Sequence, residues 1–515
     1  MKTSVYLVIT CVLLGCVTNK ALLVEVDTLI VGGMIVDGSS NEPRRGSVGI
    51  VGGSIAFIGA PNGIKAKRIV HAEGLIVSPG FIDPHTHADA DLTSSITSMN
   101  KAYLRQGVTT VFIGNDGGGT SVSELRSSLE KEGTGTNVGL WSGHGTLRSA
   151  VVGEANRAAT DTELARMQRL LSRDMKAGAL GLSTGLFYAP GSYASTDELV
   201  LLATVAASYG GVYESHIRDE SNYTVGLVNA INELIEISER ADIPAHVAHI
   251  KALGPAVHGQ SKLVIGLIKN ARKRGLAITA DQYPWLASGT RLSNALIPRS
   301  AMDGGVEHMQ TRLRDASLVL EMRPMMLANL KRRGGAAAML ITGDSPFRGK
   351  TLEQLADEDD MDMLDKAIEI ILSGDPAIAS FMMHQDDVER FLVQPWVVSG
   401  SDGSIGHPRK YGSFPKKYQD YSVKKKLLTL GEFVRQSSSR TAEIFALCKR
   451  GKLSSGYAAD IVVWDAEKFL SKATYERPTE PATGVVYLFV NGEMIIENSV
   501  LSETRAGKVV SQKDC

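Results

Sequence analysis

The stretch SPGFIDPHTH, residues 78–87, decides the fold. A short apolar segment leads directly into His85 and His87, and alternate residues of an extended strand share one face. Two neutral imidazoles on one face can bind one divalent metal ion. Seven more apolar runs follow the run at 76–87, at residues 107–116, 138–145, 179–186, 211–216, 246–251, 277–283 and 396–402.

Helical periodicity lies between these runs, for example over residues 161–175 and 225–240. Alternation of buried strands with helices predicts an α/β fold with a parallel sheet. Eight strand–helix units favour a closed (β/α)8 TIM-like barrel over residues 79–451, although residues 378–383 offer a ninth strand. Polar residues at the strand ends of such a barrel meet on one face, where active sites form.

The two ends of the chain are rich in short strands. Gly32-Gly33 and Gly52-Gly53 each separate two apolar segments, and such glycine pairs indicate β-hairpins. Residues 459–464 and 485–490 are further strands, and the turn Asn491-Gly492 follows the second. Because chain ends often lie close together, segments 25–78 and 452–503 are expected to combine into one small β-sandwich.

Composition and charge exclude several classes of protein. A chain of 515 residues exceeds the size of a single small domain, and 43% hydrophobic with 22% charged residues is ordinary for a globular protein. The net charge of -1 provides no global basic field, so we expect no nucleic-acid partner. The four cysteines form no CxxC pair, so a cysteine-based zinc site and a disulfide framework are not expected.

The first 20 residues are typical of an export signal. Lys2 precedes a mostly apolar run over residues 5–15, which is too short to span a membrane. The motif Leu13-Leu14-Gly15-Cys16 resembles the cleavage box of bacterial lipoproteins, which predicts a lipid anchor at Cys16. Plain secretion and a merely hydrophobic N-terminus are the alternatives. The expected location is the periplasm or cell envelope.

A long insertion separates the seventh and eighth runs. It covers about residues 286–376 and contains Met309, Met322, Met325, Met326 and Met339. Methionine fills irregular gaps, so the segment is either extra packing around the barrel or a lid over the site.

Side chains that can bind metal lie at the ends of four of the runs. His85 and His87 end the first, His216 ends the fifth, His249 lies near the end of the sixth and Asp402 ends the last. This arrangement favours metal ligation over packed core histidines.

Several longer motifs resemble the N-acyl-D-amino-acid deacylase (D-aminoacylase) family of the amidohydrolase superfamily. They are PGFIDPHTH (79–87), GVTT (107–110), GHGTLR (143–148), GALGLSTGLFYAPGSYA (178–194), SHIRDE (215–220), DQYP (281–284), SDG (401–403), HPR (407–409) and AADIVVWD (458–465). The resemblance implies zinc-dependent hydrolysis of the acyl amide bond of N-acyl-D-amino acids, with one or two Zn²⁺ ions and a small-molecule substrate.

The resemblance also implies roles for single residues. Asp402 matches the general base, and Tyr188 matches a tyrosine that stabilises the oxyanion. The tighter metal position would use Asp116, His216 and His249, and the second would use His85 and His87. Residues that match substrate-binding positions are Tyr283, Lys251, Arg409 and, more weakly, Arg291. Asp116 departs from the family, which usually has a cysteine there, so it is either a ligand or a turn residue.

Other interpretations remain open at this stage. Tyr188 fits ordinary packing, Lys251 a structural ion pair and Arg409 a loop contact. His144 is expected to support the site rather than bind metal, and Arg218 is expected to pair with Glu220. The function itself has alternatives: a cyclic-amide hydrolase, a hydrolase of dipeptides with D-residues, or a ligand-binding lipoprotein without turnover. The absence of lysine in the strand at residues 182–185 argues against the cyclic-amide enzymes, which often use a carboxylated lysine there.

Overall fold

The computed structural model describes residues 24–39 and 42–512. The expected export signal, with Cys16, lies outside the described residues. Within the described part of the chain, none of the helices combines the length and the apolar character that a membrane span needs.

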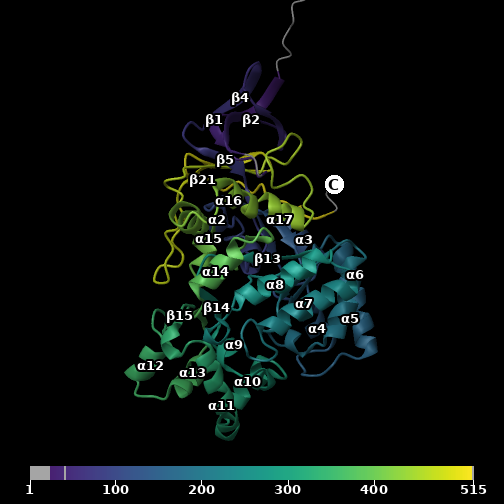
Figure 1. Cartoon of the computed structure of the whole chain (residues 1–515), viewed down its shortest axis with the longest axis vertical. Coiled ribbons are helices and arrows are strands. Elements are labelled where there is room, and N and C mark those ends of the chain that lie inside the picture. Colours follow the sequence, from purple (N-terminus) through teal and green to yellow (C-terminus); the bar gives the residue numbers. More distant parts are fainter. Residues whose placement is uncertain (1–23, 40–41, 513–515) are drawn as a thin grey trace, which may run out of the picture.

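Strands from both ends of the chain form one nine-stranded sheet, at the top of Figure 1. The strands are β1 (Val24–Ile35), β2 (Arg44–Val51), β3 (Ser54–Gly59), β4 (Ile64–His71), β5 (Ile76–Pro79), β18 (Ile461–Trp464), β19 (Val485–Val490), β20 (Glu493–Glu497) and β21 (Val500–Leu501). Their order is β21-β20-β19-β18-β5-β1-β2-β3, and β4 pairs with β1. The antiparallel pairing of β5 with β18 joins the N-terminal segment to the C-terminal one.

Two of the three predicted turns connect antiparallel strands. Gly52-Gly53 joins β2 to β3, Asn491-Gly492 joins β19 to β20, and all four residues have positive φ, as tight type I′ hairpins require. The predicted hairpin at Gly32-Gly33 is wrong. β1 continues through both glycines, and its pairing with β2 shifts register there. Gly32, with φ of 76°, accommodates an irregularity within one strand.

Ten parallel strands form two further sheets. They are β6 (Phe81–Asp83), β7 (Val108–Ile113), β8 (Asn137–Leu140), β9 (Ser142–Gly143), β10 (Gly181–Gly185), β11 (Val212–His216), β12 (Ala245–Val247), β13 (Ile278–Gln282), β17 (Val397–Ser399) and β22 (Val509–Val510). One sheet has the order β22-β8-β7-β6, and the other has β17-β13-β12-β11-β10-β9. The backbone N–H of Leu180 donates to Leu140, and that of Asp402 donates to His85, so the two sheets touch at both sides.

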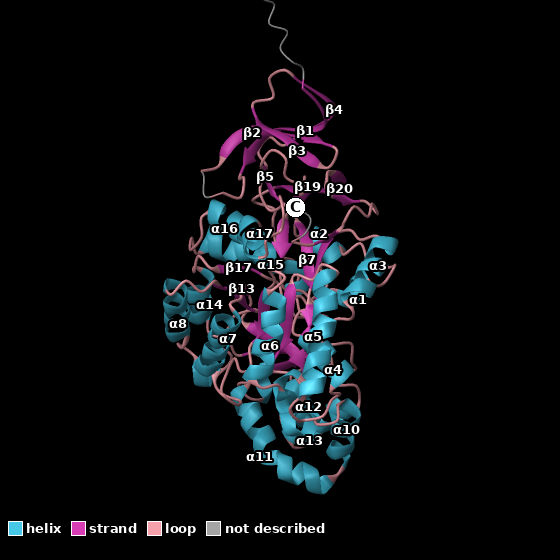
Figure 2. Cartoon of the chain, turned by 90° about the vertical axis from the view of Figure 1, so that its right-hand side faces the viewer, coloured by secondary structure: helices cyan, strands magenta, loops and turns pink. Residues whose placement is uncertain are grey.

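The helices lie around these parallel strands (Figure 2). They are α1 (Asp89–Leu92), α2 (Lys101–Leu104), α3 (Val122–Glu132), α4 (His144–Val151), α5 (Asp161–Lys176), α6 (Thr196–Ala207), α7 (Leu227–Ala241), α8 (Ser261–Lys273), α14 (Gln385–Leu392), α15 (Arg409–Lys417), α16 (Leu430–Ser437) and α17 (Ser439–Ile444). α5 and α7 confirm the two helices predicted from periodicity. Thr160 and Glu163 form a capping box that fixes the start of α5.

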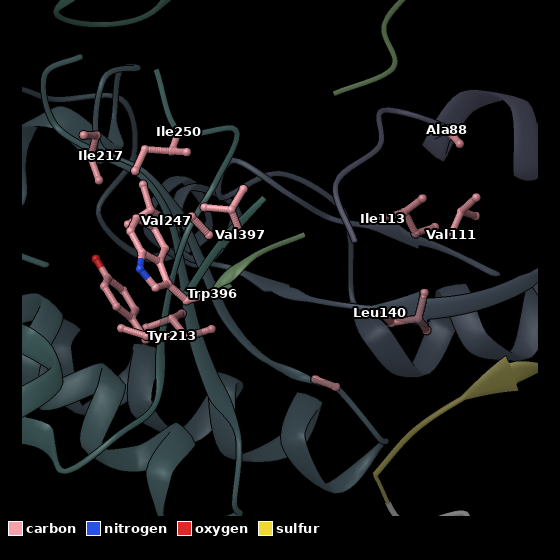
Figure 3. Close-up of a cluster of buried hydrophobic side chains, with 14 of the residues drawn as sticks. Ala88, Val111, Ile113, Leu140, Tyr213, Ile217, Val247, Ile250, Trp396 and Val397 are labelled. Carbon is pink, nitrogen blue, oxygen red and sulfur yellow. The ribbon is translucent and has the colours of Figure 1, made fainter. Parts of the chain in front are cut away.

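The main core lies between the parallel strands and these helices. Figure 3 shows part of it, with Val111 of β7, Leu140 of β8, Tyr213 of β11, Val247 of β12 and Val397 of β17. All five side chains are buried, so the strands are held rigidly and their carboxyl ends keep fixed positions.

The long insertion forms a unit with its own core, at the end of the molecule opposite the nine-stranded sheet (Figure 1). It contains the antiparallel strands β14 (Ala287–Arg291), β15 (Met339–Ile341) and β16 (Ala377–Phe381), with helices α9 (Leu292–Leu296), α10 (Val306–Arg314), α11 (Ala316–Arg332), α12 (Leu352–Glu358) and α13 (Met363–Leu372). The ninth candidate strand is therefore β16 of this unit. Met309, Met326 and Met339 fill its core as expected, Met322 packs against that core, and Met325 is exposed.

Candidate active site

Five predicted metal ligands converge at the carboxyl ends of the parallel strands. His85 and His87 follow β6, Asp116 follows β7, His216 ends β11 and His249 follows β12. Asp116 and His249 have left-handed backbone conformations, with φ of 56° and 33°. Such conformations are uncommon for residues other than glycine and gather at functional sites.

Asp116 lies at the centre of the four imidazoles. Its Oδ1 is 3.4 Å from His85 Nε2 and 3.4 Å from His249 Nε2. Its Oδ2 is 3.4 Å from His216 Nδ1 and 3.7 Å from His87 Nε2. The carboxylate therefore reaches all four imidazoles, rather than bonding its own backbone in a turn.

The donor set fits a divalent metal ion. Asp116 Oδ1, His85 Nε2 and His216 Nε2 are buried and have no hydrogen-bond partner. Ligand atoms of three groups lie close enough to share an ion: His85, Asp116 and His249; His85, His87 and Asp402; His216, Glu220 and His249. Imidazole nitrogen and carboxylate oxygen are common ligands of Zn²⁺.

The electrostatics of the cluster also favour a cation. Burial is the largest influence on His85 and lowers its pKa, but Asp116, Glu214 and Asp281 together outweigh burial and raise that pKa to about 9. Burial and Lys251 lower the pKa of His249, whereas Asp402 and Glu220 raise it, to about 10. The buried carboxylates therefore attract positive charge to the positions that a metal ion would share.

Asp402 lies beside this cluster as an ionised carboxylate. Its Oδ1 is 3.1 Å from His87 Nε2, and its Oδ2 forms an ion pair of 2.7 Å with Arg409 Nη1. Burial raises the pKa of Asp402, but the charge of Arg409 and of neighbouring histidines outweighs burial and lowers it below its usual range. A deprotonated carboxylate at this position is available to accept a proton.

Glu220 is a member of the site that the sequence interpretation placed wrongly. It was expected to pair with Arg218, but Arg218 forms its ion pair with Glu233, at 2.8 Å. Glu220 Oε1 is instead 2.6 Å from Lys251 Nζ and 3.2 Å from His249 Nδ1. The loop after β11 directs Glu220 into the site and Arg218 towards α7.

Two tyrosines face the same region. The Tyr188 ring lies 4.8 Å from the His216 ring, and burial together with Asp116 and Asp402 raises the pKa of its phenol. The buried Tyr283 ring lies 4.9 Å from the Arg409 guanidinium and 5.6 Å from Lys251 Nζ. Tyr188 therefore keeps its proton near neutral pH and can donate a hydrogen bond.

One cavity of about 590 Å³ joins these groups. Of the predicted site residues, those lining it are His87, Asp116, Tyr188, His216, His249, Lys251, Tyr283, Arg291, Asp402 and Arg409. His85 lies behind them and is fully buried. Arg291 is exposed at the rim and donates to the backbone oxygen of Asp375. The insertion supplies one wall, through residues such as Thr342 and Ile378.

Other side chains hold the predicted metal ligands in position, and the sequence analysis did not identify them. The one signal that could have suggested them is a carboxylate close in sequence to a predicted histidine ligand. Glu214 on β11 is 3.0 Å from His85 Nδ1 and accepts hydrogen bonds from Ser183 and Asn115. This contact leaves Nε2 of His85 facing the cluster. His144 bonds Glu198 at 2.9 Å, so its side chain supports the neighbouring helices.

Parallel strands that carry histidines and carboxylates at their carboxyl ends define an α/β protein with a metal-binding site. The chain belongs to the amidohydrolase family, whose model matches residues 76–495. D-aminoacylase from Alcaligenes xylosoxydans xylosoxydans is 32% identical over 94% of this chain and 98% of that protein. The resemblance inferred from the motifs is therefore confirmed.

Solved structures agree with this assignment. A D-aminoacylase structure, described with a binuclear metal center, has a TM-score of 0.82 at 30% identity and covers 94% of this chain and 100% of that one. N-acyl-D-glutamate deacylase from Bordetella bronchiseptica, complexed with zinc and a phosphonate inhibitor, has a TM-score of 0.82 at 29% identity and covers 94% and 99% of the two chains.

Proposed function

We propose that this chain hydrolyses the acyl amide bond of N-acyl-D-amino acids and releases a carboxylate and a free D-amino acid. The observation that carries the proposal is the ionised Asp402, which lies beside a cluster of four histidines and Asp116. Asp402, Asp116 and three of the histidines line one cavity. Similarity to D-aminoacylase along nearly the whole of both chains supports the same reaction.

The metal of the site is proposed to be zinc, as one or two ions. Asp116, His216 and His249 would hold the first ion, and His85 with His87 would hold the second. A bound Zn²⁺ would supply Lewis-acid polarisation of the scissile carbonyl and would make the attacking water more acidic.

The residues of the chain then perform proton transfer and charge stabilisation. Asp402 takes a proton from the attacking water and later gives it to the departing amine. Tyr188 donates a hydrogen bond from its phenol to the oxygen on which negative charge develops. Lys251, Arg409, Tyr283 and Arg291 line the same cavity and are proposed to bind the substrate carboxylate.

The finer architecture and the location are also proposals. The two parallel sheets are proposed to close into a (β/α)8 barrel, and the nine-stranded sheet to fold as a β-sandwich. We also propose export to the periplasm or cell envelope, with a lipid anchor at Cys16. The apolar N-terminal run supports export. Cys448 forms a disulfide bond, and an oxidising compartment favours such bonds. Fractionation of cells that express wild type or Cys16→Ser tests both points.

A turnover assay across matched enantiomers tests the function. The zinc-loaded protein is incubated with N-acetyl-D- and N-acetyl-L-forms of leucine, glutamine and glutamate, and the released amine is measured. We expect turnover of D-forms alone. Turnover of L-forms alone would overturn the proposal, and hydrolysis of a hydantoin instead of the linear amides would support the cyclic-amide alternative.

A further inference from the structure

Arg333 is a buried cation in the wall of the active-site cavity. It follows α11 in the insertion, lines the cavity together with the metal-binding cluster, and is 2% exposed. In the described part of the chain, no carboxylate lies within ion-pair distance of its guanidinium. A buried charge without a counter-charge is costly unless a bound group completes it.

The other buried cations of the cavity differ from Arg333 in this respect. Lys251 has Glu220 at 2.6 Å, and Arg409 has Asp402 at 2.7 Å. Each of these two cations therefore has a carboxylate partner within the protein, besides its proposed contact with the α-carboxylate of the substrate, whereas Arg333 has none. Arg291 is exposed to solvent, which screens its charge.

The contacts of Arg333 are neutral and leave donors free. Its Nε donates to the Tyr223 hydroxyl, and its Nη1 donates to Ser288 Oγ at 3.3 Å. The rings of Tyr223 and Phe187 lie 5.5 Å and 5.9 Å from its guanidinium carbon. Of the five N–H groups of an arginine, these contacts use two, and none supplies negative charge.

The position of Arg333 relates it directly to the reacting centre. The Phe187 ring is near both, because its centroid lies 5.9 Å from the Arg333 guanidinium carbon and 5.6 Å from the centroid of the His216 ring. Arg333 and the predicted metal ligand His216 also line the same cavity. A substituent of a substrate bound at the metal cluster would therefore share this cavity with the guanidinium.

We propose that Arg333 is a specificity-determining residue that binds a second carboxylate of the substrate, additional to the α-carboxylate. The planar guanidinium can bind a carboxylate with two parallel hydrogen bonds. The inference rests on the proposed function and narrows its substrate class to N-acyl-D-amino acids with an extra acid group, on the side chain or on the acyl group.

Three substrates that differ by one group test the proposal and separate the two sources. N-acetyl-D-glutamine has no second carboxylate, N-acetyl-D-glutamate has one on the side chain, and N-succinyl-D-glutamine has one on the acyl group. We expect wild type to prefer one of the two acidic substrates over the neutral one by about 10- to 100-fold in kcat/KM. Arg333→Met is expected to abolish that preference while it still hydrolyses the neutral substrate.

A pair of variants at Ser288 tests the same point without removal of the arginine. Ser288→Asp places a carboxylate against Nη1 of Arg333, so the guanidinium becomes paired within the protein. The preference for the acidic substrate should disappear in this variant. Ser288→Asn has nearly the same size but no charge, and it should retain most of the preference.

The outcomes separate this inference from the proposed function. Wild-type protein that hydrolyses no N-acyl-D-amino acid would contradict the proposed function. Wild type that is active but prefers the neutral substrate would overturn the role of Arg333 alone. The same holds if the preference survives both Arg333→Met and Ser288→Asp, if Arg333→Met slows all three substrates equally, or if Arg291→Met removes the preference instead.

Discussion

Asp402 combines two contacts that a general base needs. Arg409 keeps the carboxylate ionised, and His87 holds one of its oxygens beside the predicted metal ligands. Asp402→Asn preserves the shape but removes the proton acceptor, so we expect kcat to fall by about 10²–10⁴. Bound metal, measured by atomic emission, should stay near the wild-type value, and unchanged kcat would contradict the assignment. Loss of metal with loss of activity would instead make Asp402 a ligand.

Tyr188 is predicted to act only in the transition state. Removal of its hydroxyl in Tyr188→Phe should lower kcat by about 10²–10³ and leave KM nearly unchanged, because the substrate carbonyl carries little charge before attack. The matched control is Tyr193→Phe, whose hydroxyl donates to the backbone oxygen of Arg299. Equal kinetics of Tyr188→Phe and wild type would show that Tyr188 is an ordinary packed tyrosine.

Individual residues show what a sequence pattern can and cannot predict about this site. Residues that end apolar runs, such as His216, are placed by the strand itself, so their convergence follows from parallel topology. Glu220 lies in a loop, and a separation of two residues there is enough for Arg218 and Glu220 to point in different directions. The burial of Glu220 against Lys251 depends on the contact between loops after β11 and β12, which local spacing does not encode. Arg333 was missed because it comes from the insertion.

Lys417, at the end of α15, makes the packing of three elements depend on pH. Its ammonium is buried between Ser399 of β17 and Gln436 of α16. Burial outweighs the attraction of Asp281 and lowers the pKa of Lys417 to about 7. Between about pH 7 and the usual lysine value near 10.5, the unfolded chain therefore binds more protons than the folded one, and the free energy of unfolding rises with pH.

Replacement of Lys417 by an uncharged residue should make the free energy of unfolding depend less on pH. In Lys417→Met, the urea midpoint should change less between pH 7 and pH 9.5 than in wild type. The adjacent Lys416 pairs with Asp420 at 2.5 Å, so Lys416→Met is the matched control and should keep the wild-type slope. Identical slopes in Lys417→Met and wild type would show that Lys417 does not titrate in this range.

Glycines explain where element predictions succeeded and failed. The run at residues 76–87 was predicted as one strand, but it is divided at Gly80 between β5 and β6, which belong to different sheets. A Cβ at Gly80 would lie 2.2 Å from Thr109 Oγ1, so the close approach of β7 requires glycine there. This contact is between segments that are distant in sequence. The apolar pattern of residues 76–87 continues through Gly80 and therefore does not reveal the break between β5 and β6. The sequence analysis also did not predict β22. This strand consists of only two valines near the C-terminus and is defined by its pairing with β8.

At the scale of the whole molecule, the active-site cavity unites segments that are far apart in the chain. Strand ends of the parallel sheets provide the metal cluster, and the insertion provides the facing wall. The insertion has a core of its own, distinct from the core beneath the cluster, although Ala189 from outside the insertion packs against it. The expectation of a lid over the site stays a prediction, whereas the extra packing is visible in its buried methionines.

Metal binding should stabilise the whole fold, because the ligands come together only in the folded chain. An ion present at 100 times its Kd adds about 2.7 kcal/mol to the free energy of unfolding, which is roughly 2–3 °C in Tm for a chain of 515 residues that unfolds as one unit. Chelation should therefore lower Tm by about that amount, and added zinc should restore it. Asp116→Asn should lose most of this shift, since its carboxylate lies within 3.7 Å of all four imidazoles. Asp344→Asn alters an exposed carboxylate of the same cavity and should keep the shift. An unchanged Tm of wild type after chelation would show that the cluster binds no ion tightly enough to stabilise the fold.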